Sequence, residues 1–131
     1  MKTEIVITGI FKDSELFLVI KRNEKDDIFP GAWEFPGGHL EMGENLKDGL
    51  KRELKEEIGF DEEFSPIITH YSDEVKENNG EFIHKLEIDF IINVDSTKLN
   101  IILSNEHSEY KWVTKESELL DEFIKDKLSN I

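Results

Sequence analysis

The sequence has no cysteine and only three prolines among its 131 residues. The missing thiols exclude disulfide bonds and thiolate chemistry. Basic residues are also scarce, because 16 lysines and arginines stand against 30 aspartates and glutamates, for a formal net charge of −14. A surface this acidic repels nucleic-acid backbones and anionic lipids, so we expect neither as a partner. A small phosphate-bearing molecule stays compatible if a bound cation supplies positive charge.

Long apolar runs are absent as well. The opening segment MKTEIVITGIF is too short to span a membrane and lacks the apolar core and cleavage site of a signal peptide. With 37% hydrophobic and 35% charged residues, the chain is long enough for one core and too short to divide comfortably. We therefore expect one domain over residues 1–131 that is soluble and cytoplasmic, as a monomer or a homodimer.

Several segments are rich in the apolar and aromatic residues that favour strands. These predicted strands are Glu4–Phe11, Glu15–Arg22, Ala32–Phe35, Phe64–Tyr71, Glu81–Val94 and Tyr110–Val113. A polar loop over residues 23–31 and an Asn79-Gly80 turn separate some of them. Pro36 ends the Ala32–Phe35 strand, and the pair Gly37-Gly38 permits backbone angles that other residues avoid.

Two helices complete the pattern. In the first, Asn45 is the expected N-cap and Gly59 the expected stop, and Leu46, Leu50, Leu54 and Ile58 form an apolar stripe. The second runs through TKESELLDEFIKDKL, with Thr114 as a candidate N-cap. Strands interrupted by one helix and closed by another predict an α/β fold, an α/β/α sandwich with a mixed β-sheet.

The first helix crowds Glu53, Glu56 and Glu57 onto one arc of about 100° beside its apolar stripe. Two carboxylates roughly 5 Å apart repel by about 3 kcal/mol at an effective dielectric near 20. A solvated helix face would explain a charged segment of this kind by itself. A divalent cation would turn the repulsion into attraction, since Mg²⁺ binds a few carboxylates together with substrate phosphates.

The full spacing decides between these two interpretations. The stretch GGHLEMGENLKDGLKRELKEEIGF, residues 37–60, resembles the signature box of the Nudix hydrolases position for position. Glu34, Phe35 and Pro36 resemble the strand and turn that lead into that box. Phe60 stands where the family usually has Ile, Leu or Val, a departure that touches no catalytic position. Within the family the chain looks most like the small MutT-type nucleoside triphosphate pyrophosphohydrolases.

The resemblance implies a divalent metal, Mg²⁺ with Mn²⁺ as the alternative, and a set of metal ligands. These ligands are the Gly38 carbonyl, Glu53, Glu56, Glu57 and a late acidic residue, for which Glu109 fits better than Glu106. His107 is expected to be structural or exposed, since the hard Mg²⁺ ion prefers oxygen.

The resemblance also implies catalytic roles. Arg52 would orient Glu53, Glu44 would brace the loop against the helix, and Glu53 or Glu57 would be the general base. Trp33, Phe35, His39 and Phe82 are candidate substrate contacts, together with Tyr71.

The expected activity is metal-dependent cleavage of a nucleoside triphosphate, for example an oxidised dGTP, to a nucleoside monophosphate and pyrophosphate. Two alternatives stay open. One is an ADP-sugar or dinucleotide pyrophosphatase of the same family, and the other is a catalytically silent nucleotide-sensing module.

Overall fold

The computed structural model of the chain describes residues 1–25 and 27–131. Its elements, in chain order, are β1 (Lys2–Asp13), β2 (Leu16–Arg22), β3 (Trp33–Glu34), β4 (Gly37–His39), α1 (Leu46–Ile58), β5 (Ile67–Asn78), β6 (Glu81–Asn93), the 3-10 helix η1 (Ser96–Lys98), β7 (His107–Val113) and α2 (Glu122–Lys127). The predicted mixture of strands and helices is confirmed. Within the described part of the chain, no helix is long and apolar enough to cross a membrane.

The strands form one seven-stranded mixed sheet in the order β3-β2-β1-β6-β5, with β4 paired to β1 and β7 paired to β2. The central strands β1 and β6 run parallel in register from Lys2 opposite Ile83 to Lys12 opposite Asn93. The other pairs are antiparallel. The predicted mixed sheet is therefore confirmed.

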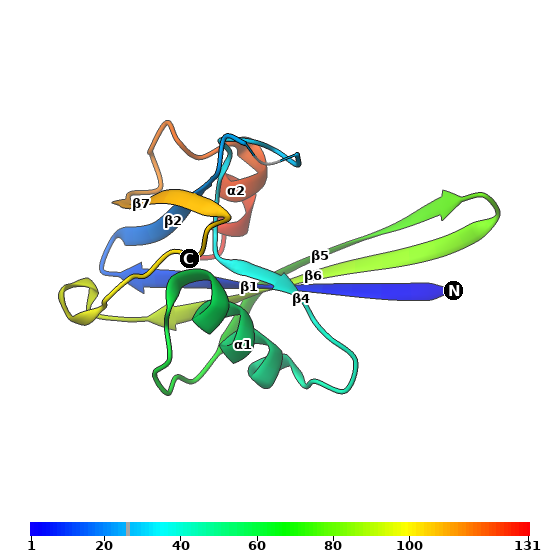
Figure 1. The fold of residues 1–131 in the computed structure, drawn as a ribbon, viewed down its shortest axis with the longest axis horizontal. Helices are drawn as coiled ribbons and strands as arrows, with labels where there is room; N and C mark the ends of the chain where they lie inside the picture. The colour runs from blue at the N-terminus through cyan, green and yellow to red at the C-terminus, as the bar shows by residue number, and fades with distance from the viewer. Residues whose placement is uncertain (26) are drawn as a thin grey trace.

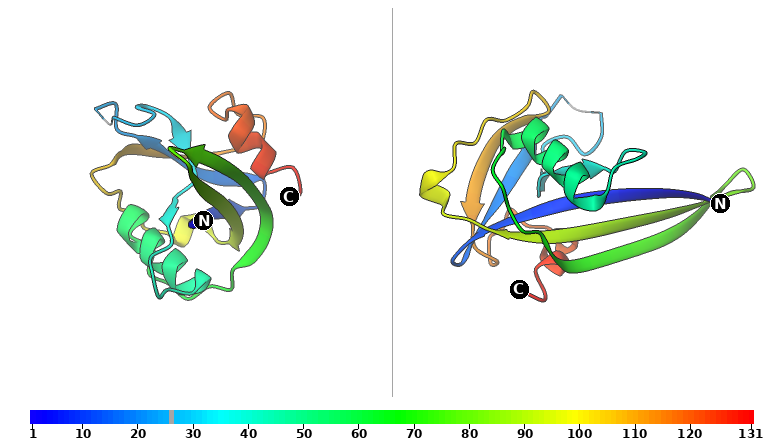
Figure 2. Two further views of the ribbon diagram at one scale, coloured as in Figure 1. Left: turned by 90° about the vertical axis from the view of Figure 1, so that its right-hand side faces the viewer. Right: turned by 90° about the horizontal axis from the view of Figure 1, so that it is seen from below.

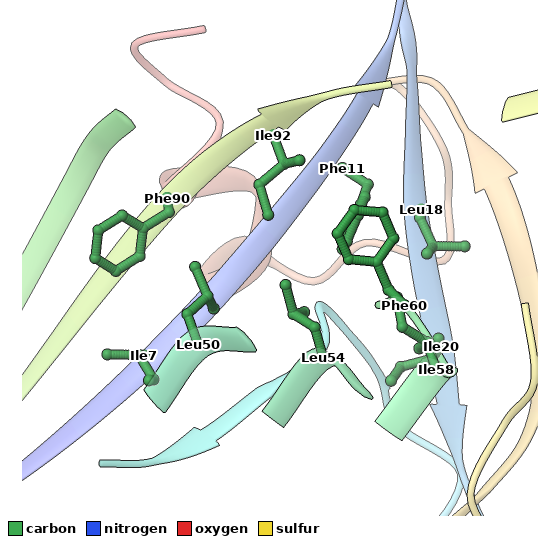
Figure 3. Close-up of a cluster of buried hydrophobic side chains, with 10 residues drawn as sticks. All are labelled: Ile7, Phe11, Leu18, Ile20, Leu50, Leu54, Ile58, Phe60, Phe90 and Ile92. Atoms are coloured by element: carbon green, nitrogen blue, oxygen red, sulfur yellow. The ribbon is translucent and has the colours of Figure 1, made fainter. Parts of the chain in front are cut away.

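The two helices lie on opposite sides of the strands (Figure 2). The predicted leucine stripe of α1 is confirmed, since Leu50, Leu54 and Ile58 are fully buried. This stripe packs on one face of the sheet in a core whose ten buried members are Ile7, Phe11, Leu18, Ile20, Leu50, Leu54, Ile58, Phe60, Phe90 and Ile92 (Figure 3). Ile124 of α2 and the flanking Leu120 and Leu128 cover the other face, where they pack with Ile10, Phe17, Val19 and Phe35. Burial of apolar surface on both faces holds the three layers together.

The hairpin β5–β6 projects well beyond both helices, alongside the N-terminal end of β1 (Figure 1). We predicted that the β5 strand would end at Tyr71, but it continues to Asn78. Its second half is exposed and, apart from Val75, polar, so no alternation marks it as a strand. The predicted turn at Asn79-Gly80 is confirmed, with φ of 52° and 82°.

The last helix is shorter than predicted. It begins after Asp121, whose carboxylate accepts a hydrogen bond from the Ile124 N–H at 2.8 Å. Thr114 does not cap it, because residues 114–120 form successive turns closed by Ser117 N–H to Thr114 O and Leu120 N–H to Ser117 O. Asp121 offers the same kind of cap nearer the buried residues, and the cap there fixes the start of α2.

Candidate active site

The helix α1 begins and ends as its sequence predicts. The Asn45 side chain accepts a hydrogen bond from the Asp48 N–H at 2.8 Å, and Gly59 closes the helix in the left-handed region with φ of 71°. These two caps set where α1 begins and ends, and the burial of its apolar stripe fixes its rotation about its axis. The edge of the helix beside that stripe then carries Glu53 and Glu57 against β4.

The two glycines of β4 are required for space rather than for unusual backbone angles. The expectation of a special φ is wrong, since neither Gly37 nor Gly38 has a positive φ. A Cβ on Gly37 would lie 2.1 Å from the Ile7 carbonyl oxygen, and one on Gly38 would lie 2.4 Å from Glu53 Oε2. Their small size lets β4 pair with β1 while the carboxylates of α1 approach the β4 backbone. The Gly37 N–H donates a hydrogen bond to Glu57 Oε1 at 2.6 Å.

The two glycines should respond differently to replacement by alanine. Gly38→Ala is expected to displace the flexible Glu53 carboxylate, so the fold survives while affinity for a divalent cation falls at least about tenfold. Gly37→Ala meets rigid backbone and should lower the free energy of unfolding by about 2 kcal/mol. A Mn²⁺ titration and urea unfolding measure the two effects. Unchanged metal affinity in Gly38→Ala would contradict the role given to this contact.

Arg52 forms hydrogen bonds with several acidic side chains along one edge of α1. Its Nε and Nη2 donate to the two oxygens of Glu44 at 2.8 and 3.0 Å, and its Nη1 donates to Glu53 Oε1 at 2.9 Å. Nη1 also lies 3.4 Å from Glu56 Oε2, and Nη2 donates to the His39 carbonyl at 3.0 Å. One guanidinium thus partly neutralises three carboxylates and ties the helix to the loop before it.

Glu44 joins that loop to the helix. Besides its two bonds from Arg52, its Oε1 accepts a hydrogen bond from the Glu41 N–H at 2.8 Å. The bonds from Arg52, followed by that backbone bond, lower the pKa of the Glu44 carboxyl. The side chain therefore stays charged and holds both segments in place.

Burial raises the pKa of both glutamates beside β4, Glu53 and Glu57. Burial raises the pKa of Glu57 to about 7, against the hydrogen bond from Gly37 and the nearby His107, which lower it. Burial also raises the pKa of Glu53, while Arg52 opposes the rise. Without a cation, Glu57 therefore retains a proton up to near-neutral pH. Glu56 differs, because its side chain is 60% exposed.

The raised pKa of Glu57 predicts that the metal-free protein loses stability as the pH rises. Between the usual carboxyl pKa of 4.5 and about 7, the folded state binds more protons than the unfolded state. The free energy of unfolding should therefore fall across this window, by up to about 3 kcal/mol. Urea unfolding at pH 5 and pH 7.5 in a chelator measures the fall. In the Glu57→Gln variant the free energy of unfolding should not show the part of this fall that comes from Glu57. An equal fall in the variant and in wild type would refute the prediction.

The residues after η1 place Glu106, and not Glu109, beside the box. Glu109 lies opposite Lys21 of β2, 4.0 Å from its ammonium and 3.9 Å from that of Lys111. The pairing of β2 with β7 shifts register between Lys21 and Arg22, so the residues on either side of this bulge point differently from a regular strand. The geometry does not support the expected ligand role of Glu109. The alternative, Glu106, lines the same cleft as Glu57.

A cleft of about 890 Å³ runs from the box across the sheet face toward α2. Glu53, Glu56, Glu57, Gly38 and Glu106 line one part of it. Of the predicted substrate contacts, Trp33, Phe35 and His39 line it too. Phe82 and Tyr71 do not, because both are exposed on the projecting β5–β6 hairpin.

Two residues at the α2 end of this cleft were not predicted from the sequence. Lys127 is buried, and its ammonium bonds to Glu87 and Asp89 at 3.0 Å each. The same ammonium lies 4.9 Å from the centre of the Phe123 ring, which is 58% exposed. The helical spacing of this segment predicts only which residues are buried. It does not distinguish Phe123 and Lys127 from residues without a role in the cleft.

Comparisons with known proteins agree with this fold. The NUDIX domain family model matches residues 2–129. The nucleoside triphosphatase NudI of Enterobacter sp. (strain 638) is 25% identical over 123 residues, which cover 89% of this chain and 86% of that protein. The MutT protein of Methanosarcina mazei Go1 superposes with a TM-score of 0.70 at 27% identity, over 96% of this chain and 90% of that one. A MutT Nudix hydrolase from Burkholderia pseudomallei, at 19% identity, shares the fold with a TM-score of 0.79 over 100% and 99% of the two chains.

The chain therefore belongs to the Nudix family. Its fold is the Nudix fold, and it is a MutT-type Nudix pyrophosphohydrolase. Nudix hydrolases generally depend on a divalent metal, and the described residues include one group of three metal-ligating side chains, Glu57, Glu106 and His107.

Proposed function

We propose that this protein hydrolyses a pyrophosphate bond of a nucleoside triphosphate, with Mg²⁺, to a nucleoside monophosphate and pyrophosphate. The observation that carries the proposal is the cleft, which joins buried carboxylates at one end to exposed aromatic residues elsewhere. The acidic end suits a metal–polyphosphate complex, whereas Phe29 and Phe123 offer apolar surface to a nucleobase. The nucleoside triphosphatase named among the relatives supports the same substrate class.

The residues present suit a divalent cation. The absence of a side chain on Gly38 lets Glu53 pack against the β4 backbone, which is the approach that a carbonyl ligand beside a carboxylate requires. Glu53, Glu56, Glu57 and the Gly38 carbonyl would hold the metal. When bound, Mg²⁺ supplies positive charge against the phosphates and lowers the pKa of a water molecule.

The chain's own groups prepare the reaction around that metal. Arg52 holds Glu53 by a hydrogen bond of 2.9 Å, so this carboxylate cannot swing freely into solvent. The Gly37 N–H fixes Glu57 in the same way from the other side. Either carboxylate would take the proton of the attacking water as general base. We place Glu53 first, because the resemblance to the MutT-type enzymes implies the general base at this position.

A substrate panel tests the proposal. The protein should be incubated with Mg²⁺ and nucleoside triphosphates, an oxidised dGTP among them, and with ADP-sugars and dinucleoside polyphosphates. Release of monophosphate and pyrophosphate from triphosphates is the expected result. Preferential cleavage of ADP-sugars or dinucleotides would show that the protein is an ADP-sugar or dinucleotide pyrophosphatase instead. Binding without turnover across the whole panel would indicate a sensing module instead.

Magnesium should also stabilise the fold by mass action, because a ligand that binds only the folded state raises the free energy of unfolding. We expect the melting temperature to rise steadily with millimolar Mg²⁺, and at 100 times the dissociation constant the gain is about 2.7 kcal/mol. Differential scanning fluorimetry measures this rise, with Na⁺ at equal ionic strength as the control. A melting temperature that does not respond to Mg²⁺ would contradict the metal site.

A further inference from the structure

His107 occupies an unusual position at the acidic end of the cleft. It is the first residue of β7, and its side chain is completely enclosed. Its N–H donates to the Ser104 carbonyl, and Arg22 of β2 lies opposite it, next to the bulge. The backbone on both sides is therefore fixed, so the imidazole has little freedom to turn.

The contacts of the ring assign its two nitrogens. Nε2 lies 3.0 Å from Glu34 Oε1, and the same oxygen accepts a bond of 3.1 Å from Arg22 Nη1. A charged carboxylate can only accept, so Nε2 carries the hydrogen, and the neutral imidazole has its lone pair on Nδ1. A histidine held in this way by a carboxylate is the usual arrangement of a metal-bound imidazole.

The other ring nitrogen, Nδ1, lies beside Glu57. Nδ1 lies 3.5 Å from Glu57 Oε2, in a geometry that makes no hydrogen bond. Among the described residues, it is the only buried side-chain nitrogen or oxygen without a hydrogen-bond partner. Leaving such an atom unsatisfied costs about 1–3 kcal/mol. A lone pair aimed at the ionised Glu57 carboxylate is repelled by it unless a proton or a metal cation lies between.

Glu106 completes the group. Donor atoms of Glu57, Glu106 and His107 all lie within 4.8 Å of one another. Around a single ion with bonds near 2.1 Å, neighbouring ligands lie about 3 Å apart and opposite ligands about 4 Å apart. The donor atoms of the three residues thus need to move only slightly closer together to bind one ion. Glu106 is exposed and lies in the turn before β7, so its side chain is free to make that adjustment.

We propose that Glu57, Glu106 and His107 form a binding site for a first-row divalent transition metal such as Mn²⁺. The site rests on the proposed function to the extent that it shares Glu57 with the Mg²⁺ site. The imidazole nitrogen distinguishes the two, because nitrogen ligands suit transition metals whereas Mg²⁺ prefers an all-oxygen shell. This proposal departs from the expectation from the sequence that His107 is structural or exposed.

Electron spin-echo spectroscopy of the wild-type protein with Mn²⁺ tests the site directly, without any turnover. We expect a ¹⁴N coupling of the strength typical of an imidazole bound to the metal. A Mn²⁺ complex without nitrogen coupling would overturn the proposal and would leave His107 as a structural partner of Glu34. This measurement needs no variant, so the burial of His107 does not compromise it.

Two variants and a control give the second readout. Glu106→Gln changes an exposed side chain and should lower Mn²⁺ affinity at least about tenfold, as should His107→Gln if it folds. His107→Gln should also lose the nitrogen coupling and should change Mg²⁺ affinity much less than Mn²⁺ affinity. His84→Gln, which alters a histidine paired with Asp73 on the β5–β6 hairpin, is the control and should change neither. Equal Mn²⁺ affinity in Glu106→Gln and wild type would refute the site.

The two proposals can fail separately. If nitrogen coupling is absent but triphosphates are cleaved with Mg²⁺, the transition-metal site is wrong and the proposed function stands. If the coupling is present but no substrate in the panel is cleaved with either metal, the metal site stands and the proposed function is wrong.

Discussion

Glu57→Gln is expected to lower kcat/KM by roughly a thousandfold while the protein stays folded. The substitution keeps the size of the side chain and removes the charge that a metal ion needs. The glutamine oxygen can still accept the hydrogen bond that Gly37 now donates to Glu57 Oε1, so the local structure should persist. Steady-state kinetics with Mg²⁺ and the preferred substrate measure the loss.

The melting temperature separates a catalytic role of Glu57 from a structural one. In a chelator it should be unchanged or slightly higher than in wild type, because a buried carboxylate next to Glu34 and Glu53 has been neutralised. The matched control is Glu62→Gln, an exposed glutamate just beyond α1, which should behave like wild type. Unfolding of Glu57→Gln would show that this carboxylate serves the fold, and the mechanism would then be wrong.

Arg52→Ala should lower the free energy of unfolding by about 2 kcal/mol without metal. The change leaves Glu44 without its two bonds and leaves the charges of Glu53 and Glu56 uncompensated. Mg²⁺ should restore part of the lost stability, since a cation bound at the same edge compensates the charges of Glu53 and Glu56. Urea unfolding with and without Mg²⁺ measures both effects.

Arg52→Lys tests whether geometry or charge matters. An ammonium keeps the charge but cannot make two parallel bonds to Glu44 while also reaching Glu53. We therefore expect a loss of kcat/KM of about tenfold or more, with stability between those of wild type and Arg52→Ala. Lys55→Ala on the exposed side of α1 is the control, with an effect within about 0.5 kcal/mol. Full activity in Arg52→Lys would show that a positive charge alone is sufficient.

The helix α1 and its contacts could be predicted because they depend on local sequence. The caps at Asn45 and Gly59 and the apolar stripe are properties of consecutive residues, and all three are confirmed. The contact between Arg52 and Glu53 was implied by the family resemblance and not by helix spacing, because residues i and i+1 of a helix do not face each other. The mixed sheet could be predicted as a class, since helices that interrupt strands require it.

The contribution of residues 106–109 to the site could not be predicted from local sequence. Whether Glu106 or Glu109 faces the box depends on a bulge between two strands that are far apart in the sequence. His107 acquires its surroundings from Glu34 and Glu57, which belong to other elements. The start of α2 was predicted wrongly for another reason. Thr114 and Asp121 are both residues that cap helices well, and only the packing of Leu120 and Ile124 favours Asp121.

The parallel pairing of β1 with β6 has a consequence for biosynthesis. During synthesis, β1 can find its partner only after about 80 further residues have been made, and such distant pairing forms slowly. The proposed metal ligands at residues 106 and 107 lie later still in the chain. A chain that stops before residue 93 would therefore lack part of the strand that pairs with β1 and both of these proposed ligands.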